Sequence, residues 1–419
     1  MASEKIAESK TESKTNNLGT LIEKELKGKP GEISIIRVVD ALIGHAFNAR
    51  ASDIHIAPEE NKVRVRLRID GVLNDIFVFP KDIQSEIITR IKVLSGLRTD
   101  EHQAAQDGRF KIPVEEVGYV DVRVSIAPTY YGENAVLRIL SERTQLFLKD
   151  LGFSERDFKI VEKAVKKPYG MILATGPTGS GKTTTLYSVI KELNTKEVSI
   201  ITIEDPIEYS IGGIDQIQVN PQTGITFAKG LRSVLRQDPN IIMVGEIRDE
   251  ETAGIAVNAA LTGHLLLSTI HTNDAATTLP RLLDMGIEPF LIASTVNVAI
   301  GQRLIRKICS NCQVKKVLND IEYESLKEVI RPELLGNHRE FFEGKGCNIC
   351  EDGYEGRVGI YEVLEMTETL RELIMKRANS SVIAETAIKE GMTTMMEDGF
   401  KKALAGITTI EEVLRIIHE

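Results

Sequence analysis

The sequence predicts an α/β protein with a central phosphate-loop domain, an α+β domain before it, and a cysteine-bearing region followed by helices. From about residue 146 to 306, short apolar runs of strand length alternate with helical patterns. This alternation is typical of a three-layer domain with a largely parallel sheet. A glycine-rich loop connects one of these strands to a helix, and two Cys-x-x-Cys pairs follow it.

The length, hydrophobic content and net charge of the chain exclude several classes of protein. The chain has 419 residues, of which 42% are hydrophobic, so several ordinary globular cores are expected. It has no apolar run of about 18 residues and no apolar segment near its N-terminus, so neither a membrane span nor a signal peptide is expected and the protein is predicted to be cytoplasmic. The formal net charge of −9 argues against a general nucleic-acid binder.

The N-terminal third is predicted to be a tail and a small α+β domain. Residues 1–31 are rich in Lys, Glu, Ser and Thr, so a polar, disordered tail is expected. In the domain over 32–145, residues 63–69 alternate strictly between apolar and polar, which indicates a half-buried strand, and Asp70-Gly71 then indicates a turn. The other elements expected there are helices over 33–48 and 82–94 and strands over 119–126 and 134–140.

The loop over 174–183 matches the pattern G-x-x-x-x-G-K-T. An apolar strand precedes it and a helix with Leu186, Ile190 and Leu193 on one face follows it, so backbone N–H groups and the helix dipole can hold phosphate there. Lys182 is expected to reach the β- and γ-phosphates and the Thr183 hydroxyl to ligate Mg²⁺. The alternative, a glycine-rich turn before a structural helix, is weak because every fixed position is present. The candidate nucleotide-binding residues are Gly176, Pro177, Thr178, Gly179, Ser180, Gly181, Lys182 and Thr183.

Acidic residues follow two of the later strands, which are predicted over 199–203 and 241–244. The first leads into Glu204 and Asp205, and the second into Glu246. The ligand crevice of a parallel sheet lies beyond the carboxyl ends of its strands, so both acid groups are expected to face the nucleotide and its Mg²⁺. A single such acid is usually a solvated turn, but two after a phosphate loop favour a site. Glu246 is the better candidate for positioning water.

Two histidines lie at the two ends of the strand predicted over 265–270. His264 is at its amino end and His271 at its carboxyl end, so by the crevice rule only His271 clearly faces nucleotide. For His264 a structural, hydrogen-bonded role is an equal alternative.

Arginines recur on the strands of the N-terminal domain. Arg64, Arg66 and Arg68 share one strand face, and Arg123 and Arg138 lie on later strands. Solvation or pairing with acids is the ordinary explanation, above all for the first three. The alternative is that Arg123 or Arg138 supplies the arginine that a phosphoryl-transfer site often needs, across a subunit interface.

The four cysteines form two Cys-x-x-Cys pairs with 34 residues between the pairs. Each pair makes a tight turn that can direct two thiolates at one ion, and four thiolates close a structural, tetrahedral Zn²⁺ site. Free thiols and a redox pair are weaker alternatives. A zinc-binding subdomain is therefore predicted over 307–363, a helical region over 364–419, and the nucleotide domain over 146–306. The predicted zinc ligands are Cys309, Cys312, Cys347 and Cys350.

In this order, the motifs resemble the secretion ATPases that power type II secretion and type IV pilus assembly. The resemblance runs from about Ile33 to the C-terminus and rests on specific segments. They are Ala51-Ser52-Asp53-Ile54-His55-Ile56 with Arg68-Ile69-Asp70-Gly71, GPTGSGKTTTLY over 176–187, ITIEDPIEY over 201–209, RQDPNIIMVGEIRD over 236–249, GHLLLSTIHTNDA over 263–275, and both cysteine pairs with GYEGR over 353–357.

The resemblance implies a RecA-like ATPase domain, a hexameric ring and the cofactors ATP, Mg²⁺ and Zn²⁺. It assigns Glu204 and Asp205 to an aspartate box, Glu246 to the Walker B position, His264 and His271 to a histidine box, and Arg123 and Arg138 to phosphate-sensing arginines. Retraction ATPases of the same superfamily are similar in the core but lack the tetracysteine insert, so an assembly motor is favoured. Family members usually carry a further N-terminal domain that docks on the membrane, whereas about 30 polar residues stand here.

The leading hypothesis is a hexameric ATPase that powers pilin or pseudopilin assembly from the inner face of the cytoplasmic membrane, on an inner-membrane platform protein. A RecA-like nucleic-acid translocase is the alternative. The acidic balance and the shortage of a basic, aromatic-rich patch count against it, so no nucleic-acid partner is expected. A non-enzymatic zinc scaffold is less favoured still, because the phosphate loop and the acidic motifs are intact.

Overall fold

The computed structural model describes residues 18–28, 32–114, 118–140, 146–350 and 352–418. The chain divides into two compact units, Met1–Thr144 and Gln145–Glu419. Among the described residues, no helix combines the length and the apolar character needed to cross a bilayer.

The first unit is a six-stranded antiparallel sheet in the order β3-β2-β1-β6-β5-β4, packed against helices. Alternation places Val63, Val65 and Leu67 in its core and the arginines between them on the opposite face. The turn between β2 and β3 has positive φ at Asp70 and Gly71, as a two-residue hairpin requires. The elements are α2 Ile35–Asn48, β1 Ala51–Pro58, β2 Lys62–Ile69, β3 Val72–Pro80, η1 Lys81–Ile83, α3 Gln84–Ser95, β4 Gln106–Val114, β5 Gly118–Thr129 and β6 Gly132–Leu140. Residues 18–26 are also helical and bury Ile22 in the core of this unit, so the prediction of a disordered tail is wrong for this segment. Residues 1–17 and 29–31 of the predicted tail lie outside the described residues.

The second unit contains a seven-stranded sheet in the order β15-β12-β7-β11-β10-β8-β9, parallel except for β15. Its central strands are buried on both faces, which explains their continuous apolar sequences. The strands are β7 Gly170–Thr175, β8 Ile200–Glu204, β9 Asp215–Gln218, β10 Ile241–Val244, β11 Leu265–Ile270, β12 Val296–Ile308 and β15 Tyr354–Glu365.

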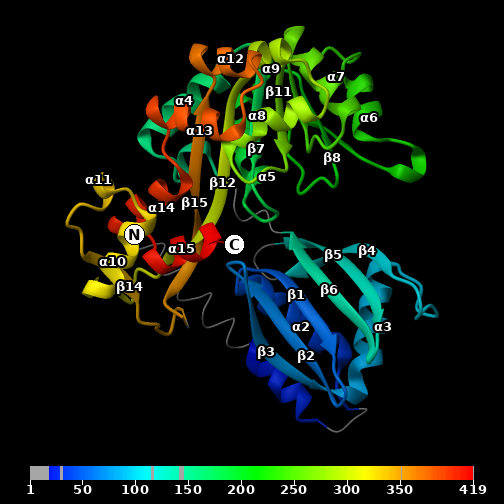
Figure 1. Cartoon of the computed structure of the whole chain (residues 1–419). Coiled ribbons are helices and arrows are strands. Elements are labelled where there is room, and N and C mark those ends of the chain that lie inside the picture. The colour runs from blue at the N-terminus through cyan, green and yellow to red at the C-terminus, as the bar shows by residue number, and fades with distance from the viewer. Residues whose placement is uncertain (1–17, 29–31, 115–117, 141–145, 351, 419) are drawn as a thin grey trace. The chain divides into compact units, whose positions relative to one another are not determined.

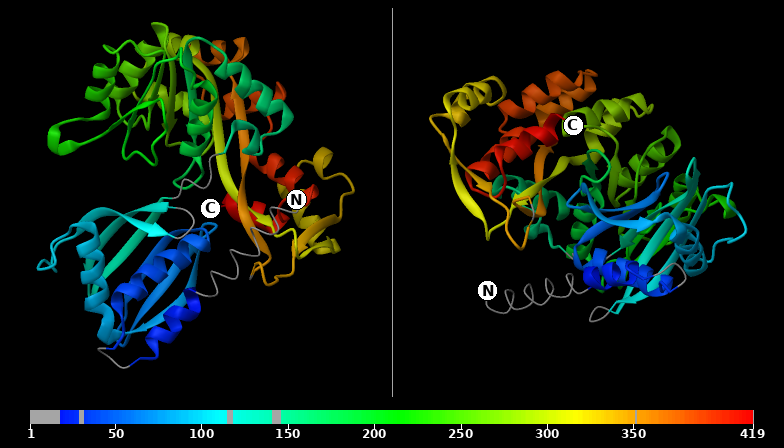
Figure 2. Two further views of the ribbon diagram at one scale, coloured as in Figure 1. Left: turned by 180° about the vertical axis from the view of Figure 1, so that it is seen from behind. Right: turned by 90° about the horizontal axis from the view of Figure 1, so that it is seen from below.

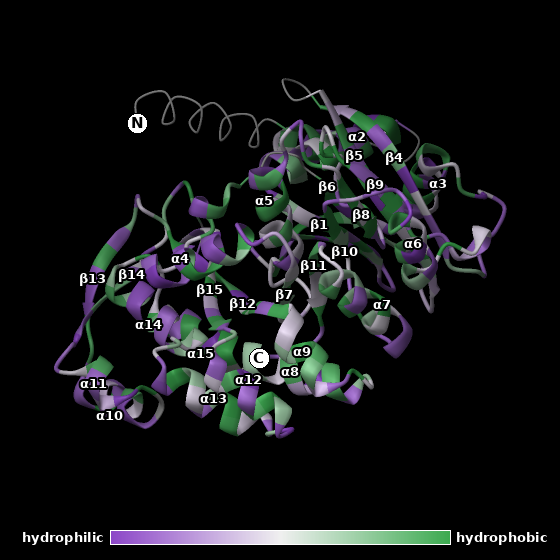
Figure 3. Cartoon of the chain, turned by 90° about the horizontal axis from the view of Figure 1, so that it is seen from above, coloured by the Kyte–Doolittle hydropathy of each residue, from purple (hydrophilic) through white to green (hydrophobic). Residues whose placement is uncertain are grey.

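Helices cover both faces of this sheet (Figure 1). Met171 and Leu173 of β7 pack with α7, α8 and α9, whereas Ile172 and Ala174 pack with α4 and α5. The helices show alternating hydrophobic and hydrophilic bands, as amphipathic helices do (Figure 3). The helical elements are η2 Leu148–Asp150, α4 Glu155–Val165, α5 Lys182–Leu193, η3 Pro221–Thr223, α6 Phe227–Val234, α7 Glu250–Leu261, α8 Ala275–Asp284, α9 Pro289–Thr295, α12 Glu368–Met375, α13 Ser380–Lys389, α14 Met395–Leu404 and α15 Ile410–His418.

The long antiparallel pair of β12 and β15 connects the sheet to the cysteine region within this unit. The two strands lie side by side in every view (Figures 1 and 2) and pair from Val298 with Glu365 to Ile308 with Tyr354. The domain boundaries predicted after residues 306 and 363 fall inside these strands. Beyond them lie a two-stranded sheet and short helices: β13 Gln313–Val317, α10 Asp320–Val329, α11 Pro332–Leu335 and β14 Glu340–Gly344.

Candidate nucleotide site and cysteine centre

The glycine-rich loop leaves the carboxyl end of β7 and opens α5, as its pattern predicts. Gly176 has a φ of 140°, and a Cβ there would lie 2.3 Å from the carbonyl oxygen of Gln302, so only glycine fits. Pro177, Thr178 and Gly179 are exposed, whereas Ser180 is buried. The loop therefore presents an open turn above a tightly packed base, a shape that suits an anion.

Lys182 begins α5 and folds back over the loop. Its Nζ donates to the carbonyl oxygens of Gly176 at 2.8 Å and Pro177 at 2.9 Å. Burial lowers the pKa of the Lys182 ammonium, and the nearby carboxylate of Glu246 opposes that shift. The phosphate-loop lysine and the acid that follows β10 are thus within electrostatic reach of each other. Thr183 is the next residue of the helix and is partly buried.

Glu246 stands among cationic and titratable groups at the carboxyl end of the sheet. Its Oε2 lies 2.8 Å from Nε2 of His271 and 2.7 Å from Nε of Arg248. The side chain of Glu246 retains 14% of its exposure, so water reaches it. A carboxylate held in place by two neighbours and open to solvent is suited to orient a water molecule.

Glu204 lies in a different environment, although it ends the adjacent strand. It is 2% exposed, and its carboxylate accepts hydrogen bonds from the Tyr187 hydroxyl, from Thr202 at 2.5 Å and from Gln216 at 3.1 Å. Burial, and then the charge of Glu204, raise the pKa of the Tyr187 hydroxyl, which therefore stays a donor. Asp205, one residue later, is exposed.

The two histidines of β11 are not brought together. His271 contacts Glu246 at the carboxyl end of the strand, whereas Nδ1 of His264 lies 2.9 Å from the backbone oxygen of Ala259 at the amino end. The backbone oxygen of His264 also accepts from Gly170 at the start of β7. His264 therefore lies at the amino ends of the parallel strands, whereas the phosphate loop lies at their carboxyl ends.

In the first unit, register places several arginines in one row across the polar face of the sheet. Arg68 faces Asp53, Asp53 faces Arg138, Arg138 faces Arg123, and Arg123 faces Arg109. Directly opposed residues share a face, so this row concentrates positive charge around one carboxylate. Asp53 is 4% exposed and lies 2.9 Å from Nε of Arg138.

The remaining arginines that the sequence singled out lie on the same strand as Arg68. Arg64 pairs with Glu59 at 2.6 Å, which is the ordinary explanation given for an exposed arginine. Arg66 faces His55 of β1 in the next row of the sheet.

The four cysteines converge in the second unit. All four sulfur atoms lie within 4.8 Å of one another, and none is in a disulfide. The Sγ–Sγ distances are 3.9 Å for Cys309 and Cys347, 3.5 Å for Cys312 and Cys350, and 3.7 Å for Cys347 and Cys350. Thiolates about 2.3 Å from a tetrahedral metal are separated by about 3.8 Å, so this spacing fits a metal ion.

The protonation of the cysteines is uneven. A hydrogen bond from the Asn311 side chain lowers the pKa of Cys347 to about 6, so this thiol is readily a thiolate. Burial raises the pKa of Cys309 and of Cys350. A bound cation would reverse that cost for the buried pair, because a coordinating thiol is deprotonated.

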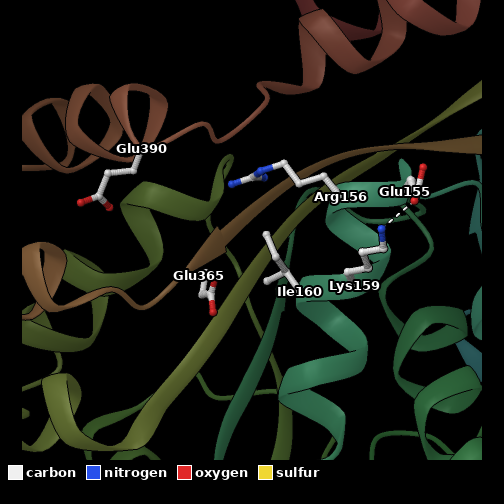
Figure 4. Close-up of a pocket in the computed structure, with 6 residues that line it drawn as sticks. All are labelled: Glu155, Arg156, Lys159, Ile160, Glu365 and Glu390. Atoms are coloured by element: carbon white, nitrogen blue, oxygen red, sulfur yellow. Dashed lines mark hydrogen bonds and ion pairs between the residues drawn. The ribbon is translucent and has the colours of Figure 1, made fainter.

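Two surface depressions in the second unit lie away from these sites. One, of about 730 Å³, lies between α4, the end of β15 and α13, and its Lys159 pairs with its Glu155 (Figure 4). The other, of about 700 Å³, lies on α6 and α7 and is rich in acidic side chains. Neither offers the backbone N–H cradle of the phosphate loop, which remains the candidate nucleotide site.

Several residues of the site were not predicted from the sequence. Tyr187 and Gln216 hold Glu204, Arg248 holds Glu246, and Gln302 packs against the phosphate loop. The available signal was weak: Gln302 is a polar residue directly after the apolar run Val-Ala-Ile-Gly of β12, where the sequence turns polar in any case.

Comparison with known proteins gives consistent matches. The family described as "Type II/IV secretion system protein" matches residues 29–415. The type IV pilus assembly ATPase PilB of Myxococcus xanthus is 43% identical over 407 residues, which cover 96% of this chain and 70% of that protein. The type II secretion system protein E of Xanthomonas campestris pv. campestris is 46% identical over 400 residues, which cover 94% and 69%.

Solved structures share the fold. The pilus retraction motor PilT with bound ADP is 29% identical, with a TM-score of 0.61, over 90% of this chain and 96% of that one. The ATPase DotB of Legionella pneumophila is 23% identical, with a TM-score of 0.67, over 90% and 95%, a likeness of fold alone.

Proposed function

Because the chain belongs to the type II/IV secretion system protein family and is an ATPase of that family, we propose that it is a motor that hydrolyses ATP to drive assembly of pilin or pseudopilin subunits. Relatives of both kinds, a pilus assembly ATPase at 44% identity and a type II secretion protein at 46%, are similar to it to nearly the same degree, so the proposal covers both machines.

One observation carries the proposal. The phosphate-loop lysine and Glu246 are within electrostatic reach of each other, and His271 lies 2.8 Å from Glu246. In this arrangement Lys182 meets the β- and γ-phosphates, and Glu246 orients and deprotonates the attacking water. Mg²⁺ held by the Thr183 hydroxyl, with the exposed Asp205 after β8 as a further candidate ligand, would neutralise charge on the phosphates.

The test of this site is Lys182→Ala. Loss of the ammonium should abolish hydrolysis and weaken nucleotide binding, measured as phosphate release and as the affinity for a fluorescent ATP analogue. Lys159→Ala, in the depression on α4, is a matched control that should hydrolyse ATP normally. Hydrolysis at the wild-type rate by Lys182→Ala would contradict the proposal.

We propose that the active species is a hexamer in which Arg123 or Arg138 contacts nucleotide phosphates. The cross-strand row of arginines supports this, because it concentrates cations on rigid strands. An arginine finger contributes roughly 10³–10⁵ in rate. Removing both arginines should therefore cut turnover strongly, whereas Arg64→Ala, on β2 outside that row, should not. Mass measurement with a non-hydrolysable ATP analogue should give six chains, and a fully active monomer would exclude the ring.

We propose that the ion of the cysteine centre is Zn²⁺, one per chain. The all-thiolate donor set and the sulfur spacing support it, because closed Cys₄ sites are typical of structural zinc. Elemental analysis should find one zinc per chain. Cys347→Ser should lose it and destabilise the cysteine region, since structural zinc contributes on the order of 10 kcal/mol of apparent binding free energy. A metal-free protein that melts like the wild type would refute this assignment.

The proposed location is the cytoplasmic face of the inner membrane, on a platform protein of the pilus or secretion machine, without a nucleic-acid partner. Sedimentation with membranes that contain or lack the platform protein tests the first part. Stimulation of ATP hydrolysis by DNA would favour the alternative function, a nucleic-acid translocase.

A further inference from the structure

Gln302 of β12 contacts both ends of the phosphate loop. Its side-chain Nε2 donates to the backbone oxygen of Ser180 at 2.8 Å. A Cβ added to Gly176 would lie only 2.3 Å from the backbone oxygen of Gln302. A Cβ added to Gly181 would lie 3.2 Å from the side-chain Nε2 of Gln302. Gln302 is 1% exposed and is held between β7 and β15, so it is a rigid support for the loop.

The hydrogen bond to Ser180 fixes the peptide that joins Ser180 to Gly181. A peptide unit is planar and trans, so its N–H points opposite to its C=O. When Gln302 holds the Ser180 oxygen, the N–H of Gly181 is directed away from β12, and it is one of the donors that a phosphate loop presents to an anion. The amide orientation is fixed too, because the opposite one would place Oε1 against the Ser180 oxygen.

Burial of the Gln302 amide at this position lowers the stability of the fold, so the amide would be unfavourable if its only role were to fill space. Within the described part of the chain, Gln302 Oε1 and the Ser180 hydroxyl are both buried without a hydrogen-bond partner. A buried unsatisfied polar group destabilises a fold, so an apolar residue like Ile300 or Leu304 on the same strand face would pack at lower cost. The Nε2 contact with the loop is what an apolar side chain cannot supply.

A second amide on β12 provides an internal comparison. Asn297 lies at the other end of β7, where its Nδ2 donates to the Tyr169 oxygen at 2.9 Å and its Oδ1 accepts from Lys167 at 3.0 Å. Both of its polar atoms are satisfied, and it contacts no part of the loop. Asn297 secures the start of β7, and Gln302 secures the loop that follows its end.

We propose that Gln302 is a positioning residue for nucleotide binding: its amide orients the Ser180–Gly181 peptide so that the loop offers its N–H groups to phosphate. The inference rests on the proposed role of the loop. Because these N–H groups contact phosphate in the ground state as well as in the transition state, loss of the amide should raise KM more than it lowers kcat.

The decisive variant is Gln302→Glu, which keeps the shape but changes the chemistry. A carboxylate repels the Ser180 oxygen, whereas a protonated carboxyl donates to it as the amide does. Affinity for a fluorescent ATP analogue should fall roughly tenfold at pH 8 and return to within about threefold of the wild type at pH 6. Asn297→Asp, whose carboxylate would meet Lys167, should bind like the wild type at both pH values.

Other titratable groups face position 302, and the comparison controls for them. They are Lys182 in the loop, Tyr361 opposite on β15, and the Lys402–Asp398 pair beside Tyr361. Because these groups are the same in Gln302→Glu and in the wild type, the ratio of the two proteins' ATP-analogue affinities at each pH reports the effect of position 302 alone.

Wild-type affinity of Gln302→Glu at pH 8, or an equal loss at both pH values, would overturn the proposal. If this variant does not fold, Gln302→Met replaces it and should lose affinity at both pH values with kcat nearly unchanged. Wild-type affinity of Gln302→Met would overturn the proposal.

The Lys182→Ala variant is measured in the same binding experiment. If it also binds normally, the proposed site itself fails; if only the Gln302 variants bind normally, the site stands and this inference fails.

Discussion

The carboxyl ends of β8 and β10 are neighbours in one parallel sheet, yet their glutamates have opposite surroundings. Glu204 is enclosed by neutral donors from Tyr187, Thr202 and Gln216. Glu246 meets Arg248 and His271 and stays accessible to water. A strand-end acid therefore takes its role from its contacts. A carboxylate saturated by buried donors stabilises structure, whereas an accessible carboxylate beside a guanidinium and an imidazole can act on water.

Among changes to the two glutamates and their neighbours, Glu246→Gln should have the greatest effect on turnover. An amide can hold water but cannot accept its proton, so turnover should fall roughly 10²- to 10⁴-fold while Mg-ATP binding is retained. Steady-state phosphate release gives the first quantity and titration with a fluorescent ATP analogue the second. If this variant hydrolyses ATP at nearly the wild-type rate, Glu204 is the better candidate for the base and Glu246 is not.

The two histidines that flank β11 test the role of the contacts around Glu246, because His271 contacts that carboxylate and His264 does not. His271→Ala removes a hydrogen bond to a charged group, so kcat should fall roughly 10- to 100-fold. His264→Ala is the matched control at the other end of the strand, and its kcat should stay near the wild-type value. Equal losses in the two variants would show that neither effect comes from the contact with Glu246.

Glu204→Gln should act on stability more than on chemistry. An amide cannot accept from every donor that now surrounds the carboxylate, and each buried donor left unpaired is costly, so the free energy of unfolding should fall by about 3 kcal/mol. Denaturant unfolding measures this, and turnover per folded molecule should exceed that of Glu246→Gln. A variant as stable as the wild type but inactive would reverse the two roles.

The smallest expected effect is that of Glu362 of β15, a buried carboxyl that accepts a hydrogen bond from the backbone N–H of Ala275. The groups that shift the pKa of Glu362 include no cation. Burial, with the nearby Asp274, raises the pKa of Glu362 to about 7. The folded state therefore binds the proton of Glu362 more tightly than the unfolded state does. Protonation of Glu362 contributes its full amount to the free energy of unfolding below about pH 4.5, and this contribution is lost as the pH rises through 7.

Relative to Glu362→Gln, the wild type should lose about 2 kcal/mol of unfolding free energy between pH 5 and 8. Thermal or denaturant unfolding of both proteins over this range measures the difference. A pH-independent difference would mean that the environment of Glu362 does not shift its titration.

Much of this arrangement follows from local sequence. The phosphate loop, the buried strands of the second unit, the alternating β2 and the tight turn of each cysteine pair depend on residues close together in the chain. The convergence of the two cysteine pairs was predicted from the chemistry of their spacing motif, because 34 residues separate them. What local patterns could not supply is the contrast between Glu204 and Glu246. This contrast depends on Tyr187 and Gln216, which reach Glu204 from other elements. Local patterns also could not show that the strand order brings β12 and Gln302 beside the phosphate loop.

The most direct test of the account is a crystal structure of the Glu246→Gln variant with Mg-ATP bound. We expect a water molecule within hydrogen-bond distance of the side chain at position 246 and in line with the γ-phosphate, with Glu204 still accepting from Tyr187. A structure in which Glu204 has left Tyr187 to hold that water, with position 246 turned away from it, would contradict the account.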